Sequence, residues 1–244
     1  MTSVVPTKAR DVILAEVAEK YSEQLNALAP KGTDAAHYIA SLRLYFAQNP
    51  KVLECSPISV CVGMLRVAQC GLDLGVSCDL LPFGKECQFS PRYNGIIELA
   101  LHAGARAVNA DVVREGDDFE FEKGTAFRLS HRKRSSTALI SHAYAIAELK
   151  PGSYVFEVLL RDEIERTRAQ FSKQWKNGAL EAIPWYAKKT AVRRIAPYLP
   201  KNARFAAALQ FAEQADGAEI VVEGHPVDTQ TGEIHEGASQ MVGP

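Results

Sequence analysis

The sequence predicts an α+β protein in which helices flank an antiparallel β-sheet built from hairpins. Before Gly71 and again after Asp162, apolar residues recur at three- and four-residue spacing, which is the period of an amphipathic helix. Between Arg106 and Arg161 the pattern changes to extended stretches separated by turns that contain glycine. Helices placed before and after a run of strands favour the α+β class.

Three helices are expected before Gly71. The first is DVILAEVAEKYSEQLNAL, and the second is DAAHYIASLRLYFAQN, which Pro50 stops. The third is ISVCVGMLRVAQC, for which Ser56 and Pro57 supply the N-cap and the first turn and Gly71 the terminator. The apolar residues of the first two helices are candidates for part of a subunit contact, with ordinary core packing as the alternative. They are Val12, Leu14, Tyr38 and Leu42.

The stretch LLPFGKECQFSPRYNG, which begins at Leu80, is predicted to form a polar hairpin. It does not fit a phosphate-binding loop, because Glu86 follows Gly84-Lys85 where a serine or threonine is needed and Asp79 takes the place of the first glycine. We expect Phe83 and Phe89 of this hairpin to be core residues rather than supports for bases, and Lys85 and Arg92 to be exposed.

The remaining elements follow in order. GIIELALHAG reads as a short helix ending at Gly104, and the strands are RAVNADVVREG, DFEFEKG, TALISHAYAIAEL and SYVFEVLLR. KPGS between the last two strands predicts a turn that pairs them as a hairpin. After Asp162 the helical pattern returns, and PWYAKKTAVRRIAPYL forms a helix that Pro184 opens and Pro197 breaks. Trp185 at its start is expected to anchor in the core rather than to stack on a base.

Charge is distributed unevenly along a chain whose formal net charge is -1. Residues 205–244 hold seven acidic residues and no lysine or arginine, so residues 1–204 carry -1 + 7 = +6. The sequence therefore predicts a core over residues 1–215 and an acidic flexible tail over residues 216–244. Partner docking, a limit on nonspecific DNA contacts, and no role at all remain alternatives for the tail.

Two stretches of the core are strongly basic. Residues 173–204 hold eight lysines and arginines against Glu181, and RLSHRKR spans Arg128–Arg134. Clustered cations suit a polyanionic partner, although a solvated surface is the alternative. RLSHRKR is expected to be either a mobile loop over a binding groove or a solvated turn.

The sequence gives little support to a zinc or redox protein, a membrane or secreted protein, or a nuclease. The five cysteines contain no CxxC pair, which favours reduced, buried thiols over a zinc or redox site. No apolar run is long enough to span a membrane and the N-terminus lacks a signal-peptide pattern, so we expect a cytoplasmic protein. DFEFEK superficially resembles nuclease carboxylates, but Phe121 stands where an acid is needed. No catalytic or metal-ligating residue is therefore assigned, and a metal-dependent DNA-processing enzyme (nuclease) is kept as the alternative.

Four stretches resemble, in order and spacing, the RecT family of phage and prophage single-strand DNA annealing proteins, which are Redβ-related recombinases. They are SVCVGMLRVAQCGLDLG, LLPFGKECQFSPRYNGIIELALHAG, EGDDF and PWYAKKTAVRRIAPYLP, and the resemblance covers roughly residues 49–200. PFGKECQF and KKTAVRR are its most specific parts. The family usually has Gly-Tyr-Lys-Gly or Gly-Tyr-Arg-Gly where this chain has Arg92-Tyr93-Asn94-Gly95, which argues against a DNA role for Asn94 and makes Arg92 the candidate there.

The resemblance implies ATP-independent binding of single-stranded DNA and annealing of complementary strands during phage-type homologous recombination. It implies a homo-oligomer, a ring or helical filament that holds DNA in a basic groove, and as partners a phage 5'-3' exonuclease and the host single-strand-binding protein. No cofactor is required, and whether Mg²⁺ assists annealing is left open. We expect the DNA contacts to come from the hairpin, the RLSHRKR stretch and the helix after Pro184. These residues are Lys85, Gln88, Arg92, Tyr93, Arg128, Arg132, Lys188, Lys189, Arg193 and Arg194.

Overall fold

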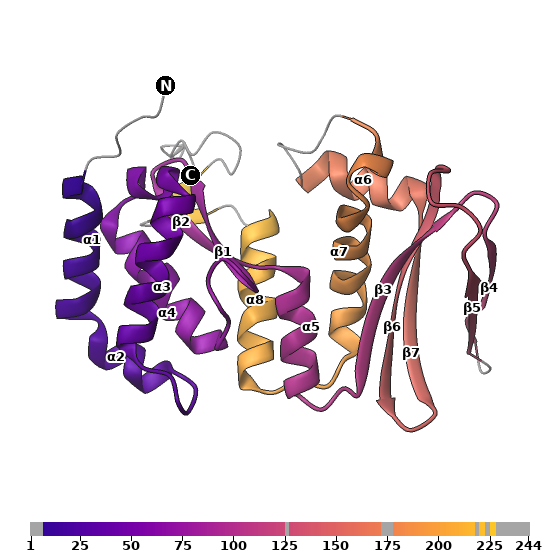
Figure 1. The fold of residues 1–244 in the computed structure, drawn as a ribbon, viewed down its shortest axis with the longest axis horizontal. Coiled ribbons are helices and arrows are strands. Elements are labelled where there is room, and N and C mark those ends of the chain that lie inside the picture. Colours follow the sequence, from indigo (N-terminus) through magenta and orange to yellow (C-terminus); the bar gives the residue numbers. More distant parts are fainter. Residues whose placement is uncertain (1–6, 125–126, 172–177, 218–219, 223–224, 228–244) are drawn as a thin grey trace, which may run out of the picture. The chain divides into compact units, whose positions relative to one another are not determined.

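The computed structural model describes residues 7–124, 127–171, 178–217, 220–222 and 225–227 of the 244-residue chain (Figure 1). Its helices and antiparallel sheets confirm the predicted α+β class. The chain divides into two compact units, Met1–Pro91 with Gln210–Pro244, and Arg92–Leu209.

The first unit begins with helices whose ends the sequence marks clearly. The predicted first helix is in fact two, α1 (Thr7–Lys20) and α2 (Ser22–Leu28), because the backbone leaves the helical region at Tyr21. In α3 (Ala35–Gln48) the Asp34 carboxylate caps the first turn by accepting from the His37 N–H at 2.9 Å. A 3₁₀ turn, η1 (Pro50–Glu54), then leads to α4 (Pro57–Cys70).

The predicted caps of α4 are confirmed at both ends. The Ser56 hydroxyl accepts from the Ser59 N–H at 3.3 Å, and Gly71 ends the helix in the left-handed region with φ of 69°. Such a φ strains any residue that carries a β-carbon, which explains glycine at this position.

Most of the apolar residues proposed for a subunit contact belong to the core of this unit. Leu14, Tyr38 and Leu42 expose 7%, 3% and 0% of their surface, so core packing is the correct alternative for them. Val12 is 56% exposed. The amphipathic pattern alone could not separate the two, because a helix face that packs inside a unit and one that packs on a second subunit carry the same residues.

The predicted hairpin after Leu80 is confirmed as β1 (Cys78–Phe83) paired with β2 (Glu86–Pro91), with Gly84 at φ of 58° in the turn. Phe89 is buried as expected, and Phe83 is half-buried. The helix α4 lies so close to β1 that a β-carbon on Gly63 would be only 2.7 Å from Leu80 Cδ2. The Tyr45 hydroxyl accepts from the Leu80 N–H at 3.1 Å and so satisfies a buried backbone donor.

The second unit is built on a three-stranded antiparallel sheet. The strand order is β3 (Ala107–Arg114), β6 (Ile140–Lys150) and β7 (Ser153–Leu160), so β3 and β7 are the edges. The predicted KPGS hairpin between β6 and β7 is confirmed, with Gly152 in its turn at φ of 75°.

Helices cover one face of this sheet and a separate hairpin covers the other (Figure 1). The helices are α5 (Tyr93–His102) and α7 (Pro184–Ile195), and α6 (Arg161–Phe171) and the 3₁₀ turn η2 (Leu180–Ala182) precede α7. A second 3₁₀ turn, η3 (Ala196–Tyr198), follows α7 where Pro197 was expected to break it. The hairpin is β4 (Asp118–Glu122) with β5 (Arg128–Arg132).

The strand β5 corrects the expectation for RLSHRKR, which is neither a mobile loop nor a solvated turn. Its residues alternate between half-buried and exposed positions, whereas in β4 only Phe119 is half-buried and the other residues are exposed. Phe119 stacks on Tyr144 of β6 with ring centroids 5.8 Å apart, so apolar contact with the sheet holds the hairpin in place. The sequence did not show this alternation, because lysines and arginines dominate the RLSHRKR stretch.

The C-terminal region contains α8 (Ala203–Gly217) and a short antiparallel pair, β8 (Ile220–Val222) with β9 (His225–Val227). Residues 218–219, 223–224 and 228–244 of the predicted tail lie outside the described residues, so the tail and its boundary at residue 216 stay predictions. All five cysteines are free and buried, as expected. Among the described residues, no helix has the length and apolar character needed to cross a membrane.

Candidate nucleic-acid interface

The helix α7 carries four of the predicted DNA-binding residues. Its apolar side is fully buried against the sheet, with Ala187, Ala191 and Val192 each at 0% exposure. Arg194 is exposed, whereas Lys188 and Lys189 are half-buried. The helix therefore presents cations along the margin of a firmly packed apolar stripe.

Arg193 is a correction, because it was expected to be an exposed cation like Lys189. Its Nε and Nη2 atoms are buried, and removal from water lowers the pKa of its guanidinium to about 10. Tyr186, Thr190 and Arg193 lie four and three residues apart on one line of the helix, and the first two are buried. The side chains on this line of the helix face the interior of the unit, so the Arg193 guanidinium is buried with them.

Lys188 is held by a carboxylate rather than projecting alone. Its ammonium lies 3.1 Å from Asp111 Oδ1 of β3, and Lys133, which follows β5, lies 2.5 Å from the other oxygen of the same carboxylate. The Asp111 side chain thus joins the edge strand to α7 and to the hairpin.

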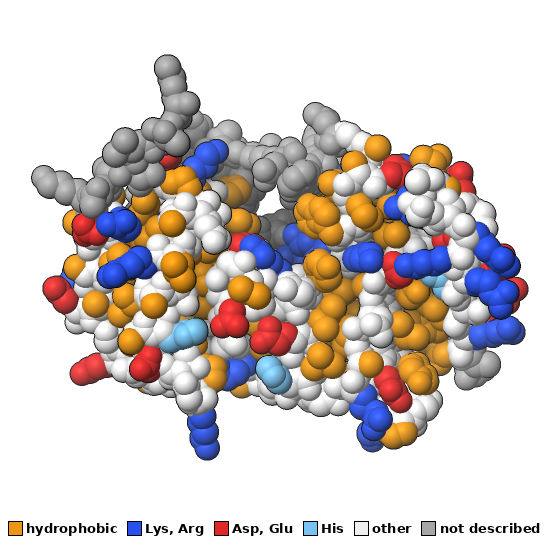
Figure 2. Space-filling view, viewed as in Figure 1, with side chains coloured by type: hydrophobic (Ala, Val, Ile, Leu, Met, Phe, Trp, Pro, Cys, Tyr) orange, Lys and Arg blue, Asp and Glu red, His pale blue; other side chains and the backbone are white. Residues whose placement is uncertain are grey.

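The β4–β5 hairpin bears Arg128 and Arg132 on its exposed side, but it does not form a purely basic surface. In the register of the pair, Arg128 lies opposite Glu122 and Arg132 opposite Asp118. Arg128 also forms an ion pair with Glu120 at 3.6 Å. Figure 2 shows acidic side chains among the lysines and arginines over this hairpin. A basic strand beside an acidic strand attracts DNA less strongly than the basic strand would alone.

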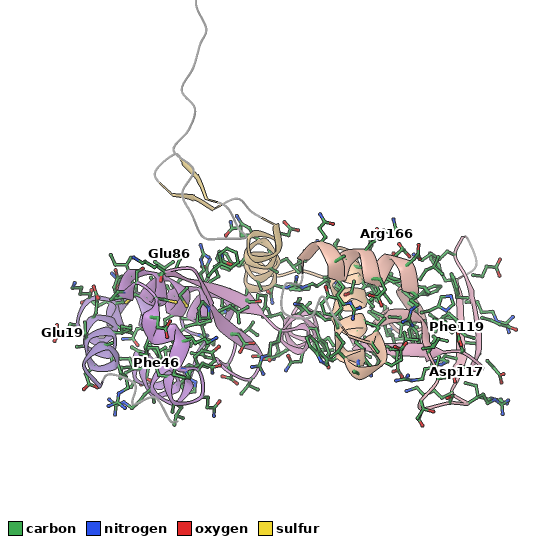
Figure 3. The ribbon with its side chains drawn as sticks, turned by 90° about the horizontal axis from the view of Figure 1, so that it is seen from above. Glu19, Phe46, Glu86, Asp117, Phe119 and Arg166 are labelled. Atoms are coloured by element: carbon green, nitrogen blue, oxygen red, sulfur yellow. The ribbon has the colours of Figure 1, made fainter. Side chains whose placement is uncertain are left out.

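Asp117 anchors the end of this hairpin to the turn that precedes it (Figure 3). Its two oxygens accept hydrogen bonds from the backbone N–H groups of Arg134 (2.6 Å), Arg114 (2.9 Å) and Ser135 (3.1 Å). His131 Nε2 lies 3.1 Å from the same carboxylate. Burial alone would raise the pKa of Asp117, but these hydrogen bonds outweigh it and hold the pKa far below its usual range. The basic stretch is therefore rigidly placed.

Lys85 and Gln88 belong to the first unit, where the β1–β2 turn is tied to the start of α4. The Ser56 N–H donates to the Lys85 carbonyl at 2.7 Å, and the Cys87 N–H donates to the Ser59 hydroxyl at 2.9 Å. Lys85 is exposed, as predicted, and Gln88 is half-buried. The turn thus presents an exposed ammonium from a fixed backbone.

Arg92 and Tyr93 stand at the N-terminus of α5 in the second unit. Arg92 is exposed, as predicted, and takes the N-cap position, while Tyr93 is half-buried. Trp185 at the start of α7 was expected to anchor in the core, which is wrong, because 37% of its surface is exposed. Its neighbour Tyr186 points inward instead and is only 6% exposed.

Lys173 and Lys176 of the basic stretch lie outside the described residues. Within the described part of the chain, no group of three or more His, Cys, Asp or Glu side chains is arranged to hold a metal ion. The acids of β4, which suggested nuclease carboxylates, face outward, and Asp118 and Glu120 form ion pairs with Arg134 and Arg128.

Comparison with known proteins decides the family. The RecT family model matches residues 39–228 of this chain. The chain belongs to the RecT family. It is 35% identical over 226 residues to Protein RecT of Escherichia coli (strain K12), covering 85% of this chain and 82% of that protein. It is also 28% identical over 156 residues to the uncharacterized protein YqaK of Bacillus subtilis (strain 168), covering 60% of this chain and 54% of that protein.

RecT-family membership confirms the resemblance and gives the chain a role in DNA recombination by strand annealing. The blocks that carried the resemblance now have structural places, PFGKECQF in the β1–β2 hairpin and KKTAVRR on α7. Sequence reasoning missed Asp111 and did not single out Lys133. Nothing in the local pattern around Asp111 marks it, because its partners are distant in the chain.

Glu181 of η2 fixes the start of α7 on this unit. Its Oε1 accepts from Arg161 Nη1 at 2.6 Å and from the Ile140 N–H at 2.9 Å. The Arg161 guanidinium is the main cause that lowers the pKa of Glu181 from 4.5 to about 2, with partial burial opposing it. A carboxylate whose pKa is lowered by folding stabilises the protein above its unfolded pKa and loses that effect as pH falls toward the folded pKa.

We predict that Glu181→Gln lowers the free energy of unfolding at pH 7 by about 2 kcal/mol, because Arg161 loses its closest carboxylate partner while solvent around the pair weakens the effect. The difference from the wild type should shrink as pH falls from 4.5 toward 2. Urea unfolding at a series of pH values measures this, with the exposed Glu19→Gln as the matched control (Figure 3). A difference that stays constant down to pH 2 would contradict the assignment.

Proposed function

We propose that this RecT-family protein binds single-stranded DNA without sequence preference and anneals complementary strands without ATP. The observation that carries the proposal is α7, where the family-specific block places Lys189 and Arg194 outside a helix whose opposite side is locked onto the sheet. Fixed cations of this kind suit contacts with phosphates, which track a strand without reading its bases.

The proposed activity needs charge screening rather than covalent catalysis. Two complementary strands repel each other, and lysines and arginines that neutralise their phosphates release bound counterions. Such binding weakens steeply with salt, by about 0.7 in log K per log unit of salt for each phosphate contacted on a single strand. The proposed phosphate contacts are Lys85, Gln88, Arg92, Arg128, Arg132, Lys188, Lys189 and Arg194.

Aromatic side chains are proposed as the second part of the interface. Trp185 is 37% exposed at the start of α7, next to the basic residues of that helix, and Tyr93 is half-buried at the start of α5. Bases stack on such rings regardless of sequence. The exposure of Trp185 moves it from the core, where the sequence placed it, to a stacking role in this proposal. Arg193, with its buried guanidinium, supports α7 from within.

A test of the function combines labelled complementary oligonucleotides with the full chain, with and without ATP and Mg²⁺. We expect faster duplex formation without ATP, with both strands intact, because the protein screens phosphate repulsion. Denaturing gels report strand length and a fluorescence pair reports annealing. Shortened strands in the presence of Mg²⁺ would instead support a metal-dependent nuclease.

A second test concerns α7. Lys189→Ala combined with Arg194→Ala should weaken binding of a labelled single strand and reduce the salt slope by about 1.4, since two phosphate contacts are lost. Circular dichroism should not change, because Arg194 is exposed and Lys189 lies at the margin of the buried stripe, where cations add little to stability. Arg193→Ala is the matched comparison, and it should lower stability because it leaves a gap among buried groups. Wild-type affinity and salt slope in the double variant would exclude α7 from the interface.

Assembly forms a further part of the proposal. One chain offers contacts to only a few nucleotides, and accurate annealing requires many bases displayed together, so subunits join into a ring or helical filament on DNA. We expect the mass measured by light scattering to increase with the length of the single strand added, and to increase again with its complement. A monomer at every strand length would contradict the assembly.

A 5'-3' exonuclease that generates the strand and a host single-strand-binding protein complete the proposed partners.

A further inference from the structure

The carboxylate of Asp111 lies between two ammonium groups that come from different elements. Lys133 Nζ is 2.5 Å from Asp111 Oδ2, and Lys188 Nζ is 3.1 Å from Oδ1. The Val112 N–H also donates to Oδ1 at 2.9 Å. Burial alone would raise the pKa of Asp111, but the lysines and the Val112 N–H outweigh it, so the group stays ionised.

This cluster is open to solvent on one side. The side chains of Asp111, Lys188 and Lys133 expose 22%, 31% and 59% of their surface. Each ammonium has three donors, of which Asp111 uses one. The cluster carries a net charge of +1 and leaves donors for a second anion. A single anion shared by two lysines is also the arrangement that a DNA phosphate would take between them.

We propose that Lys133 and Lys188 form a phosphate subsite for single-stranded DNA, and that Asp111 occupies this subsite when DNA is absent. The inference rests on the proposed function, because it concerns the same partner. When a strand binds, a backbone phosphate takes the place of Asp111 beside one or both ammonium groups. Lys133 thereby becomes a DNA contact that the sequence had not singled out.

The resident carboxylate weakens the grip on DNA without abolishing it. A lysine that already neutralises Asp111 must exchange one ion pair for another, and it releases fewer counterions than a solvated lysine would. The phosphate must also approach a negative charge that remains nearby. Contacts made in this way are easily broken, which suits a protein that must let strands shift until their bases match.

The experiment measures single-strand binding by the full chain over a range of salt concentrations. Asp111→Asn keeps the size and the hydrogen-bond acceptor of the side chain but removes its charge. We expect binding to tighten by about three- to tenfold at low salt and the salt slope to steepen by about 0.7. When Lys133→Ala is already present, Asp111→Asn should give a smaller gain than it gives in the wild type, because only Lys188 is left to be released, so the two substitutions are not additive.

Asp162→Asn is the matched control. Asp162 lies on α6 of the same unit, where it pairs with Arg166 at 3.2 Å, and the loss of its charge changes the net charge by the same amount. We expect less than about a twofold change in affinity and additivity with Lys133→Ala, because distant sites act independently. Thermal unfolding of each variant reports whether it is folded.

Separate results overturn the inference and the proposed function. Wild-type protein that fails to bind single strands overturns both. If the wild type binds and folded Asp111→Asn binds no more tightly, or gains no more than Asp162→Asn, the subsite alone is wrong. Should Asp111→Asn fail to fold, Lys133→Ala by itself decides, since it must reduce the salt slope, although by less than the roughly 0.7 of a lysine without a resident carboxylate, and an unchanged slope overturns the subsite.

Discussion

The close packing of α7 on the central strand β6 is the contact on which the second unit depends. Ala187 and Ala191 of the helix, and Ala143 and Ala145 of the strand, are all fully buried. Side chains that end at the β-carbon let a helix lie near a sheet, and larger ones would force it away. This contact fixes the rotation of α7 about its axis, and the rotation determines which cations reach solvent.

That rotation explains why cations of similar appearance have different surroundings. Arg194 is exposed, Lys188 is held at the edge strand by Asp111, and the guanidinium of Arg193 is carried inward along the line of Tyr186. The charge count of a helix therefore overstates the charge that it offers to a partner. In this unit, part of the positive charge is paired or buried within the protein and therefore stabilises the fold instead of contacting a partner.

Local signals in the sequence predicted the elements well. Ser56 and Gly71 set the ends of α4, and KPGS set the turn between β6 and β7, because caps and turns depend on a few neighbouring residues. The errors arose where distant contacts decide. The exposure of Trp185 depends on how α7 is rotated, and the strand β5 depends on a sheet to pack against. The pairing of Asp111 has no local signature at all.

The charge pattern of the β4–β5 hairpin governs the distance at which it acts. The exposed side of one strand is acidic and that of its partner is basic, with Arg132 opposite Asp118 and Arg128 opposite Glu122. Seen from afar, such a ribbon is a row of dipoles whose fields largely cancel, and salt screens what remains within about 10 Å. The hairpin therefore has almost no influence on a strand still diffusing toward the protein. It acts only on a DNA strand that is already in contact with it. There, phosphates beside the basic β5 are attracted and phosphates beside the acidic β4 are repelled.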